Sequence, residues 1–208
     1  MSSSWSYLDP VVLPLLVGET VLDAGCGLGR WGALIETNYW EARLPQPPAV
    51  DGFDAFEPNV RRCRERGTYR RVWRQEMPSP LMGSWDTVLV CEMIEHVEQS
   101  DIDAVLGALE EVALRRIIVT TPNSPLMREG CGTPVGHNAF EAHKSYVPAS
   151  TFRRRGYRIR GAGFGRYNSR LAIAAKRAGV RSSLTSVPRR LPAIAETLVA
   201  IKDFSSGG

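Results

Sequence analysis

The residues best suited to chemistry lie in a glycine-rich turn near the start of the chain. Gly25, Gly27 and Gly29 follow a short apolar run that ends in Asp23, and a helical pattern opens at Arg30. Glycine suits such a turn because a Cβ atom would keep the backbone N–H groups away from a ligand. The later glycines also satisfy the dinucleotide pattern G-x-G-x-x-G, so the glycines alone do not identify the ligand. A carboxylate before them would repel a pyrophosphate but would attract an ammonium group.

A second carboxylate is predicted at the end of the next strand. Residues 49–54 read as a strand that ends in Asp54, and the following helix begins near Pro58. An acid at this point can accept hydrogen bonds from both hydroxyls of a ribose. Asp51 competes for that role, but Asp54 stands where the strand ends and is therefore preferred.

A third group of polar residues follows the apolar residues 88–91. Glu92, Glu95 and His96 emerge directly after this predicted strand, where ligands bind in open α/β sheets. His96 is the best candidate for a general base because imidazole titrates near neutrality. The alternative is a structural histidine that bonds to the loop.

The elements that would position these groups alternate along the chain. Strands are predicted by apolar runs, the first of which ends at Asp23, and by the runs at residues 49–54, 69–73, 88–91, 116–121, 157–164 and 196–204. Helices are predicted at residues 30–37, 59–66, 101–114, 151–155 and 170–178. Five strand and helix units followed by a terminal strand pair indicate an α/β protein with one sheet.

These motifs resemble those of the class I S-adenosylmethionine (SAM) dependent methyltransferases. The first has the form D-x-G-C-G-x-G, and residues 85–97 resemble the form F-D-x-V-x-x-x-E-V-I-E-H. The resemblance covers residues 5–204 and implies a Rossmann-like class I methyltransferase fold. Its seven-stranded, mostly parallel sheet would have the order 3-2-1-4-5-7-6, with helices on both faces. It also implies SAM as the cofactor and S-adenosylhomocysteine as the product.

The resemblance assigns roles to individual residues. The cofactor would contact the glycine turn, the ends of the second and third strands and the start of the third polar group, that is Asp23, Gly25, Cys26, Gly27, Gly29, Arg30, Asp54, Ala55, Glu76, Met77 and Glu92. Asp54 would hold the ribose and Glu76 the adenine edge, with Gln75 as the alternative for the adenine. Arg30 could pair with the SAM carboxylate, although an exposed helix arginine is equally ordinary.

The acceptor side is assigned to Glu92, His96 and His143 as catalytic candidates, with no metal. Residues 124–146 form a Gly- and Pro-containing loop that would wall the acceptor pocket, since a long polar loop in a compact domain is usually functional. His143 and Tyr146 resemble an H-x-S-W segment of uncharacterised family members, with tyrosine in place of tryptophan. A small-molecule acceptor, methylated on O or N, is favoured because the arginines do not interleave with aromatic residues as in a base-stacking surface.

Three other functions stay open. The string Glu92-x-x-Glu95-His96 with a later histidine resembles the metal site of the small-RNA 3′-terminal 2′-O-methyltransferases, and His137 fits their distal histidine loosely. A metal-dependent enzyme of that kind is the main alternative. An NAD-dependent oxidoreductase would use the same glycines but lacks a recognisable hydride-transfer constellation. A SAM-binding module without activity is compatible with every cofactor residue.

Composition fits one compact domain spanning residues 1–208. The 208 residues are 43% hydrophobic, without an apolar run of 18 residues, and the start lacks the basic and apolar regions of a signal peptide, so a cytoplasmic protein without a membrane span is expected. Four cysteines at positions 26, 63, 91 and 131 lack metal-site or disulfide spacing and are expected to be reduced thiols.

The net charge of +4 comes mainly from arginine, which supplies 23 of the 26 basic residues. Arginines cluster at residues 61–74 and 153–160, which favours solvated helix and strand faces over a nucleic-acid surface. Residues 5–18 contain two prolines and are expected to form a short cap before the first strand. Residues 168–192 are basic and are expected to form a lid or the interface of a homodimer.

Overall fold

A computed structural model describes residues 4–41, 46–125, 129–164 and 189–205 of the chain. The first half contains η1 (Ser6–Leu8), α1 (Asp9–Val12), η2 (Leu13–Leu15), β1 (Thr20–Ala24), α2 (Arg30–Glu41), β2 (Ala49–Asp54), α3 (Glu57–Arg66), β3 (Arg71–Arg74) and β4 (Trp85–Cys91). The second half contains η3 (Ile94–His96), η4 (Gln99–Asp101), α4 (Ile102–Glu111), β5 (Ala113–Pro122), β6 (Cys131–Thr133), β7 (Gly136–Asn138), η5 (Ala139–Glu141), α5 (Ala149–Arg154), β8 (Arg158–Phe164), η6 (Pro192–Ile194) and β9 (Ala195–Asp203).

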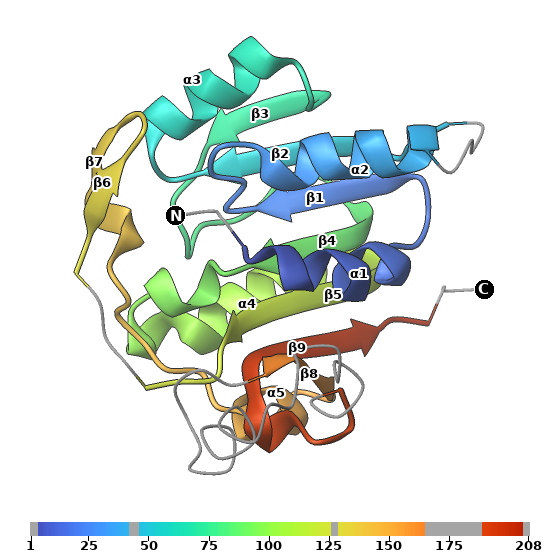
Figure 1. Ribbon diagram of the computed structural model, residues 1–208, viewed down its shortest axis with the longest axis vertical. Helices are drawn as coiled ribbons and strands as arrows, with labels where there is room; N and C mark the ends of the chain where they lie inside the picture. Colours follow the sequence, from blue (N-terminus) through green and yellow to red (C-terminus); the bar gives the residue numbers. More distant parts are fainter. Residues whose placement is uncertain (1–3, 42–45, 126–128, 165–188, 206–208) are drawn as a thin grey trace, which may run out of the picture.

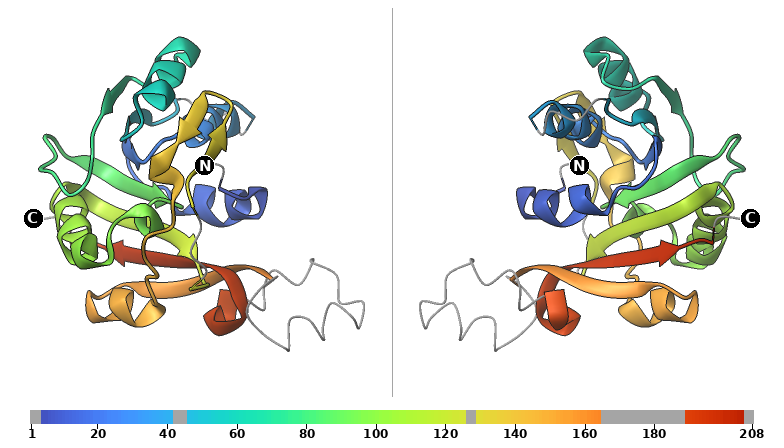
Figure 2. Two further views of the ribbon diagram at one scale, coloured as in Figure 1. Left: turned by 90° about the vertical axis from the view of Figure 1, so that its left-hand side faces the viewer. Right: turned by 90° about the vertical axis from the view of Figure 1, so that its right-hand side faces the viewer.

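The main sheet has seven strands in the order β3-β2-β1-β4-β5-β9-β8, with helices on both of its faces (Figures 1 and 2). Strands β1 to β5 pair in parallel, while β9 runs antiparallel to both β5 and β8. When only the strands of this sheet are numbered, the order is the predicted 3-2-1-4-5-7-6. The sequence did not predict the separate two-stranded hairpin of β6 and β7.

The core lies on the two faces of this sheet because neighbouring residues of a strand point in opposite directions. Two hydrophobic clusters make up the core. In β1, Leu22 belongs to the cluster that includes residues of α4 and α5, while Val21 belongs to the cluster that includes residues of α1 and α2. In β4, Val88 and Leu89 divide in the same way. Residues 21–22 and 88–90 are therefore apolar toward both faces, as is typical of a parallel sheet covered on both sides.

Two predicted boundaries need correction. The helix predicted at residues 101–114 ends at Glu111, because Ala113 already pairs with Trp85 as the first residue of β5. The third strand was predicted from residue 69, but β3 begins at Arg71 and the Tyr69 ring packs in the core against α2. The predicted helix at residues 170–178, and most of the basic segment 168–192, lie outside the described residues.

The N-terminal residues form a set of short turns rather than one helix. Residues 6–15 form η1, α1 and η2, and a proline is the second residue of both α1 and η2. Buried Leu8, Val11 and Val12 pack these turns onto the core. The cap therefore covers one face of the sheet beside α2 (Figure 1).

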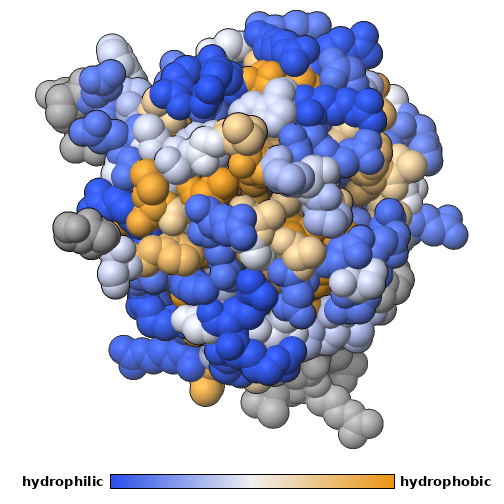
Figure 3. Space-filling view, turned by 180° about the vertical axis from the view of Figure 1, so that it is seen from behind, coloured by the Kyte–Doolittle hydropathy of each residue, from blue (hydrophilic) through white to orange (hydrophobic). Residues whose placement is uncertain are grey.

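The exposed surface is mainly polar, with apolar side chains gathered in the middle of the face that Figure 3 shows. Among the described residues, no helix is both long enough and apolar enough to cross a bilayer. Several arginines are paired within the chain. Arg155, for example, contacts Glu110 at 3.0 Å and Asp103 at 3.2 Å. Cys26, Cys63 and Cys91 are buried free thiols, as expected.

Candidate functional site

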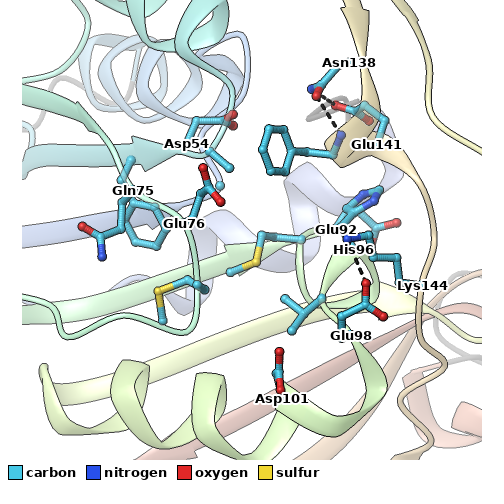
Figure 4. A pocket seen from close by; sticks show the side chains of 17 residues that line it. Asp54, Gln75, Glu76, Glu92, His96, Glu98, Asp101, Asn138, Glu141 and Lys144 are labelled. Carbon is cyan, nitrogen blue, oxygen red and sulfur yellow. Dashed lines mark hydrogen bonds and ion pairs between the residues drawn. The ribbon is translucent and has the colours of Figure 1, made fainter.

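A cavity of about 180 Å³ opens where the parallel strands β1, β2 and β4 end (Figure 4). Gly25 reaches it after β1, Asp54 from the end of β2 and Glu92 after β4. The cavity is also lined by predicted site residues from the neighbouring connections, namely Ala55, Glu76, Met77 and His96. Side chains from residues 138–144 form the wall opposite Asp54 and Glu76. The carboxyl edge of the sheet therefore brings together the three motifs that the sequence analysis singled out.

The glycine turn is built from left-handed backbone conformations. Gly25, Gly27 and Gly29 have φ angles of 74°, 52° and 83°, which side chains rarely adopt. At Gly25 an added Cβ would also lie 2.5 Å from the Cγ of Met93, a residue that lines the cavity. The backbone N–H groups of Gly25 and Cys26 donate to the carbonyl of Phe53 at 2.9 and 2.8 Å, which ties the turn to β2.

Asp54 connects the end of β2 to the glycine turn. Its carboxylate accepts hydrogen bonds from the Gly27 and Phe56 N–H groups, both at 2.8 Å, and from Asn59 Nδ2 at 3.2 Å. Burial raises the pKa of Asp54, and these three hydrogen bonds oppose that rise. Asp54 thus lies on the cavity wall, where the acid predicted to bind the ribose must be.

Asp51 has a different environment. Its carboxylate is fully buried and accepts hydrogen bonds from Arg70 at 2.7 Å, Arg71 at 2.6 Å and Trp85 Nε1 at 2.9 Å. Burial disfavours the ionised form, but these partners outweigh it and hold the pKa of Asp51 well below its usual range. Asp51 is absent from the cavity lining and joins β2 to β3 and β4.

Asp23 lies beneath the turn rather than on the cavity wall. Its side chain is buried and accepts a 2.6 Å hydrogen bond from the Tyr69 hydroxyl, which itself accepts from the Gly32 N–H at 3.2 Å. Burial raises the pKa of Asp23 to about 7, although the bond from Tyr69 opposes that rise. The sequence pattern predicted an ammonium group as the partner of this acid, but in the structure its partner is Tyr69.

Tyr69 is a residue that the sequence analysis missed as part of the site. Its ring fills space beside α2 and β2, where a Cβ at Gly32 would lie 2.8 Å and one at Gly52 2.9 Å from ring atoms. The third glycine of G-x-G-x-x-G therefore makes room for a tyrosine. An aromatic residue among arginines before β3 gave no local signal of this contact.

Some of the remaining cofactor candidates line the cavity, and others contact only neighbouring parts of the protein. The Nη2 of Arg30 donates to both carboxylate oxygens of Asp9 in α1, at 2.6 and 2.7 Å, and so holds the N-terminal cap against the start of α2. Glu76 and Gln75 both line the cavity (Figure 4). Glu76 also pairs with Arg74 at 2.5 Å. Asp23, Cys26, Gly27, Gly29 and Arg30 stand outside the cavity lining.

Glu92 occupies a strained position on the cavity wall. It has a φ angle of 51°, and it is the one non-glycine residue with positive φ among the described residues. Thr120 of β5 fixes this conformation, because its carbonyl accepts from the Glu92 N–H at 3.0 Å and its hydroxyl donates to the Glu92 carboxylate at 3.0 Å. Backbone strain of this kind is often found at functional sites.

His96 is held at the edge of the cavity by the segment after η5. Its Nδ1 lies 3.0 Å from the carbonyl oxygen of Ala142, so this nitrogen carries the proton in that contact and Nε2 has a lone pair. Burial lowers the pKa of His96 to about 4, which favours the neutral ring. The Lys144 and Ser145 N–H groups donate to the Glu95 carbonyl at 2.8 and 3.1 Å and fix this segment beside η3.

The same contacts bring His143 to His96, although 46 residues separate them in the sequence. Their ring centroids lie 5.0 Å apart, and potential donor atoms of Glu95, His96 and His143 all lie within 4.8 Å of one another. Such a set could hold a divalent cation. His137, the histidine that the sequence suggested for the metal-dependent alternative, is exposed in β7 and is not part of this group, whose later histidine is His143.

Comparisons with known proteins give a family, a partial relative and a fold. Residues 7–163 match the family model described as a methyltransferase domain. The ubiquinone biosynthesis O-methyltransferase of Pseudomonas paraeruginosa is 34% identical over 89 residues, which is 39% of this chain and 35% of that protein. The chain thus matches only about a third of the length of this curated relative.

Solved structures match most of the chain. The magnesium protoporphyrin IX methyltransferase from Synechocystis PCC 6803, with S-adenosylhomocysteine bound, has a TM-score of 0.58 at 17% identity and covers 95% of this chain and 82% of its own. A SAM-dependent methyltransferase from Archaeoglobus fulgidus has a TM-score of 0.57 at 16% identity, with 95% and 91% covered. At these identities the likeness shows that the fold is shared.

Proposed function

Because the chain belongs to the methyltransferase-domain family, we propose that it is a SAM-dependent methyltransferase that methylates an O or N atom of a small-molecule acceptor. The observation that carries the proposal is Asp54, a carboxylate that lines the cavity while one of its oxygens is bound by the glycine turn and the other by Phe56 and Asn59. A ribose beside it would find hydrogen-bond acceptors already oriented. The cofactors of the solved relatives and the O-methyltransferase activity in the relative's name support the same reading.

The cavity residues fit such a cofactor. Asp54 would hold the ribose, while Glu76 and Gln75, beyond β3, would face the adenine amino group. Gly25 leaves the approach open because it has no Cβ, and Glu92 would lie beside the reacting methyl group. Asp23 would support the turn through Tyr69, since its carboxylate is already bound there.

The chemistry needs alignment more than activation, because SAM supplies a methyl group on a positively charged sulfur. The acceptor's lone pair would form the new bond to the methyl carbon as the carbon–sulfur bond breaks. The electron pair of the broken bond would stay on the sulfur of S-adenosylhomocysteine. An acceptor hydroxyl must also lose its proton. His96 presents Nε2 for that proton, because its Nδ1 is fixed to Ala142, but its pKa of about 4 makes it a weaker base than a free imidazole.

Calorimetry with SAM, S-adenosylhomocysteine and NAD tests the cofactor. Micromolar binding of the first two, without binding of NAD, is expected, and it would exclude the oxidoreductase alternative. Release of S-adenosylhomocysteine with an acceptor panel separates an enzyme from an inactive SAM-binding module. A chain that binds none of the three cofactors would refute the proposal.

A second candidate, metal-assisted methylation, is favoured by the group formed by Glu95, His96 and His143. Of these three residues only His96 lines the cavity, so a divalent cation would lie at its edge, where it would lower the pKa of a bound hydroxyl. Manganese binding can be measured by electron paramagnetic resonance for the wild type and for His143→Ala. Turnover that chelation leaves unchanged, together with no manganese binding, would remove this candidate.

A further inference from the structure

Phe140 differs from the other large apolar side chains that line the cavity. Phe53 and Val97 belong to the core cluster that includes residues of α4 and α5, and Met77 and Met93 pack against that cluster. Phe140 lines the same cavity but is part of neither core cluster, and it is 39% exposed. Among the described residues, no other aromatic ring pairs with it. Packing of the core therefore does not explain a phenyl ring at this position.

The exposed phenyl ring lies in the part of the cavity that the acceptor would occupy. Other exposed large apolar residues of the described chain lie outside the cavity lining, namely Trp5, Trp40, Met82, Leu114 and Leu191. Scattered apolar side chains on the open surface are ordinary, whereas one on a cavity wall offers apolar contact to a ligand. Figure 4 shows Asn138 and Glu141, which precede and follow Phe140 in the chain, across the cavity from Asp54 and Glu76. Phe140 is therefore not needed for the ribose or the adenine.

The turn that carries Phe140 is fixed by hydrogen bonds on both sides. The side chain of Asn138, which is buried, accepts from the Phe140 N–H at 3.0 Å, and its Nδ2 donates to the Glu141 carboxylate at 3.3 Å. After the turn, the Ala142 carbonyl oxygen contacts His96 Nδ1 at 3.0 Å. A side chain on a backbone held in this way loses less conformational freedom when a ligand packs against it.

We propose that the acceptor is a small aromatic molecule whose ring packs against Phe140. This proposal rests on the proposed function of the site and names its substrate class. Two aromatic rings attract each other in offset or edge-to-face arrangements, and this attraction adds to the gain from burying apolar surface. A saturated ring of the same size gains only from the burial. Phe140 is therefore a residue that determines which acceptors bind.

The test compares two ring compounds that share a carbon skeleton and a hydroxyl: benzyl alcohol, which is aromatic, and cyclohexylmethanol, which is saturated. The wild-type protein is saturated with S-adenosylhomocysteine and titrated with each compound by ligand-observed NMR. We expect benzyl alcohol to bind about two- to tenfold more tightly, because the pair of rings adds to the burial that both compounds share. Burial alone would favour cyclohexylmethanol, whose apolar surface is larger.

Variants of Phe140 test where the ring binds. Phe140→Leu keeps an apolar side chain without an aromatic face, so it should weaken benzyl alcohol binding about two- to tenfold and change cyclohexylmethanol binding by less than about twofold. Phe140→Tyr keeps the ring and should bind both compounds as the wild type does. Trp40→Leu removes an exposed ring of α2 outside the cavity lining and is the matched control. All three variants should fold, because neither Phe140 nor Trp40 is part of a core cluster.

The outcomes separate this proposal from the proposed function. If S-adenosylhomocysteine binds but benzyl alcohol binds no more tightly than cyclohexylmethanol, or if neither compound binds, the aromatic acceptor is refuted while the cofactor site stands. Unchanged benzyl alcohol affinity in Phe140→Leu would refute the contact with Phe140. Uridine, titrated in the same way, should bind more weakly than benzyl alcohol, and tighter binding would overturn the proposal in favour of a nucleobase. If S-adenosylhomocysteine itself does not bind, the proposed function fails.

Discussion

The two acids of β2 offer a sharp test, because the structure gives them separate tasks within three residues. Replacing Asp54 with Asn should weaken SAM binding and change folding stability little. The carboxylate presents two acceptor oxygens to three donors, from Gly27, Phe56 and Asn59. An amide keeps one acceptor oxygen and turns an NH₂ group toward a backbone N–H.

The magnitude follows from the bonds lost. One charge-assisted hydrogen bond to the ribose and one to the glycine turn would weaken or disappear, at about 1.5–3 kcal/mol for a bond to a charged group. This corresponds to an increase of about 10- to 100-fold in the dissociation constant of SAM. The effect on unfolding should be smaller, because burial raises the pKa of Asp54 and removing its charge relieves that cost.

Asp51→Asn is the matched control on the same strand. It removes the charge that Arg70, Arg71 and Trp85 bind, and it should reduce the free energy of unfolding by about 2 kcal/mol. A larger cost is not expected, because the two arginine side chains are 48% and 62% exposed and solvent screens them. The SAM dissociation constant should change by less than about twofold.

Calorimetry with SAM and urea denaturation measure the two quantities for both variants. The assignment of Asp54 to the cofactor would be refuted by wild-type SAM affinity in Asp54→Asn. It would also be refuted if Asp51→Asn lost SAM affinity while remaining folded, because SAM binding would then depend on the buried Asp51 carboxylate rather than on Asp54 at the cavity.

The remaining predictions concern Asp23 and its neighbours. The pKa of Asp23 is raised to about 7 in the folded state, so its favourable contribution to stability is complete below about pH 4 and is lost as the pH rises through 7. Asp23→Asn should remove that loss. The unfolding free energy of the variant minus that of the wild type, measured by urea denaturation, should therefore rise by up to about 4 kcal/mol between pH 4 and pH 8. A constant difference across this range would contradict the burial argument. Tyr69→Phe removes the hydroxyl between Asp23 and the Gly32 N–H and should cost about 1–3 kcal/mol, with Tyr39→Phe as the control. Gly32→Ala should cost a similar amount in thermal unfolding, because its Cβ would lie 2.8 Å from the Tyr69 ring.

The fold could be predicted because its signals are local. Apolar residues run together at positions 21–22 of β1 and 88–91 of β4, and apolar residues flank Asp51 in β2. Each strand ends at or just before a polar or glycine residue. Residues at such ends must meet at one edge of a parallel sheet. Gly25, Asp54 and Glu92 could therefore be assigned to one site before any contact was known.

Contacts between distant segments could not be predicted in this way. The hairpin of β6 and β7 has short, polar strands without the alternation that marks a strand. His143 reaches His96 only because Lys144 and Ser145 bond to the backbone of Glu95. These bonds join residues about fifty positions apart, and no pattern within either segment predicts them.

Asp23 shows why a motif can locate a site and still leave a partner undetermined. A buried carboxylate needs hydrogen-bond donors, and a ligand ammonium and a tyrosine hydroxyl both satisfy that need. The sequence around Asp23 contains the carboxylate but neither donor, whereas the donor found in the structure, Tyr69, lies 46 residues away. Gly32 and Gly52 are consistent with Tyr69 as the partner, because a Cβ at either position would collide with the Tyr69 ring. The spacing of the glycines thus reflects packing within the protein as well as the approach of a ligand.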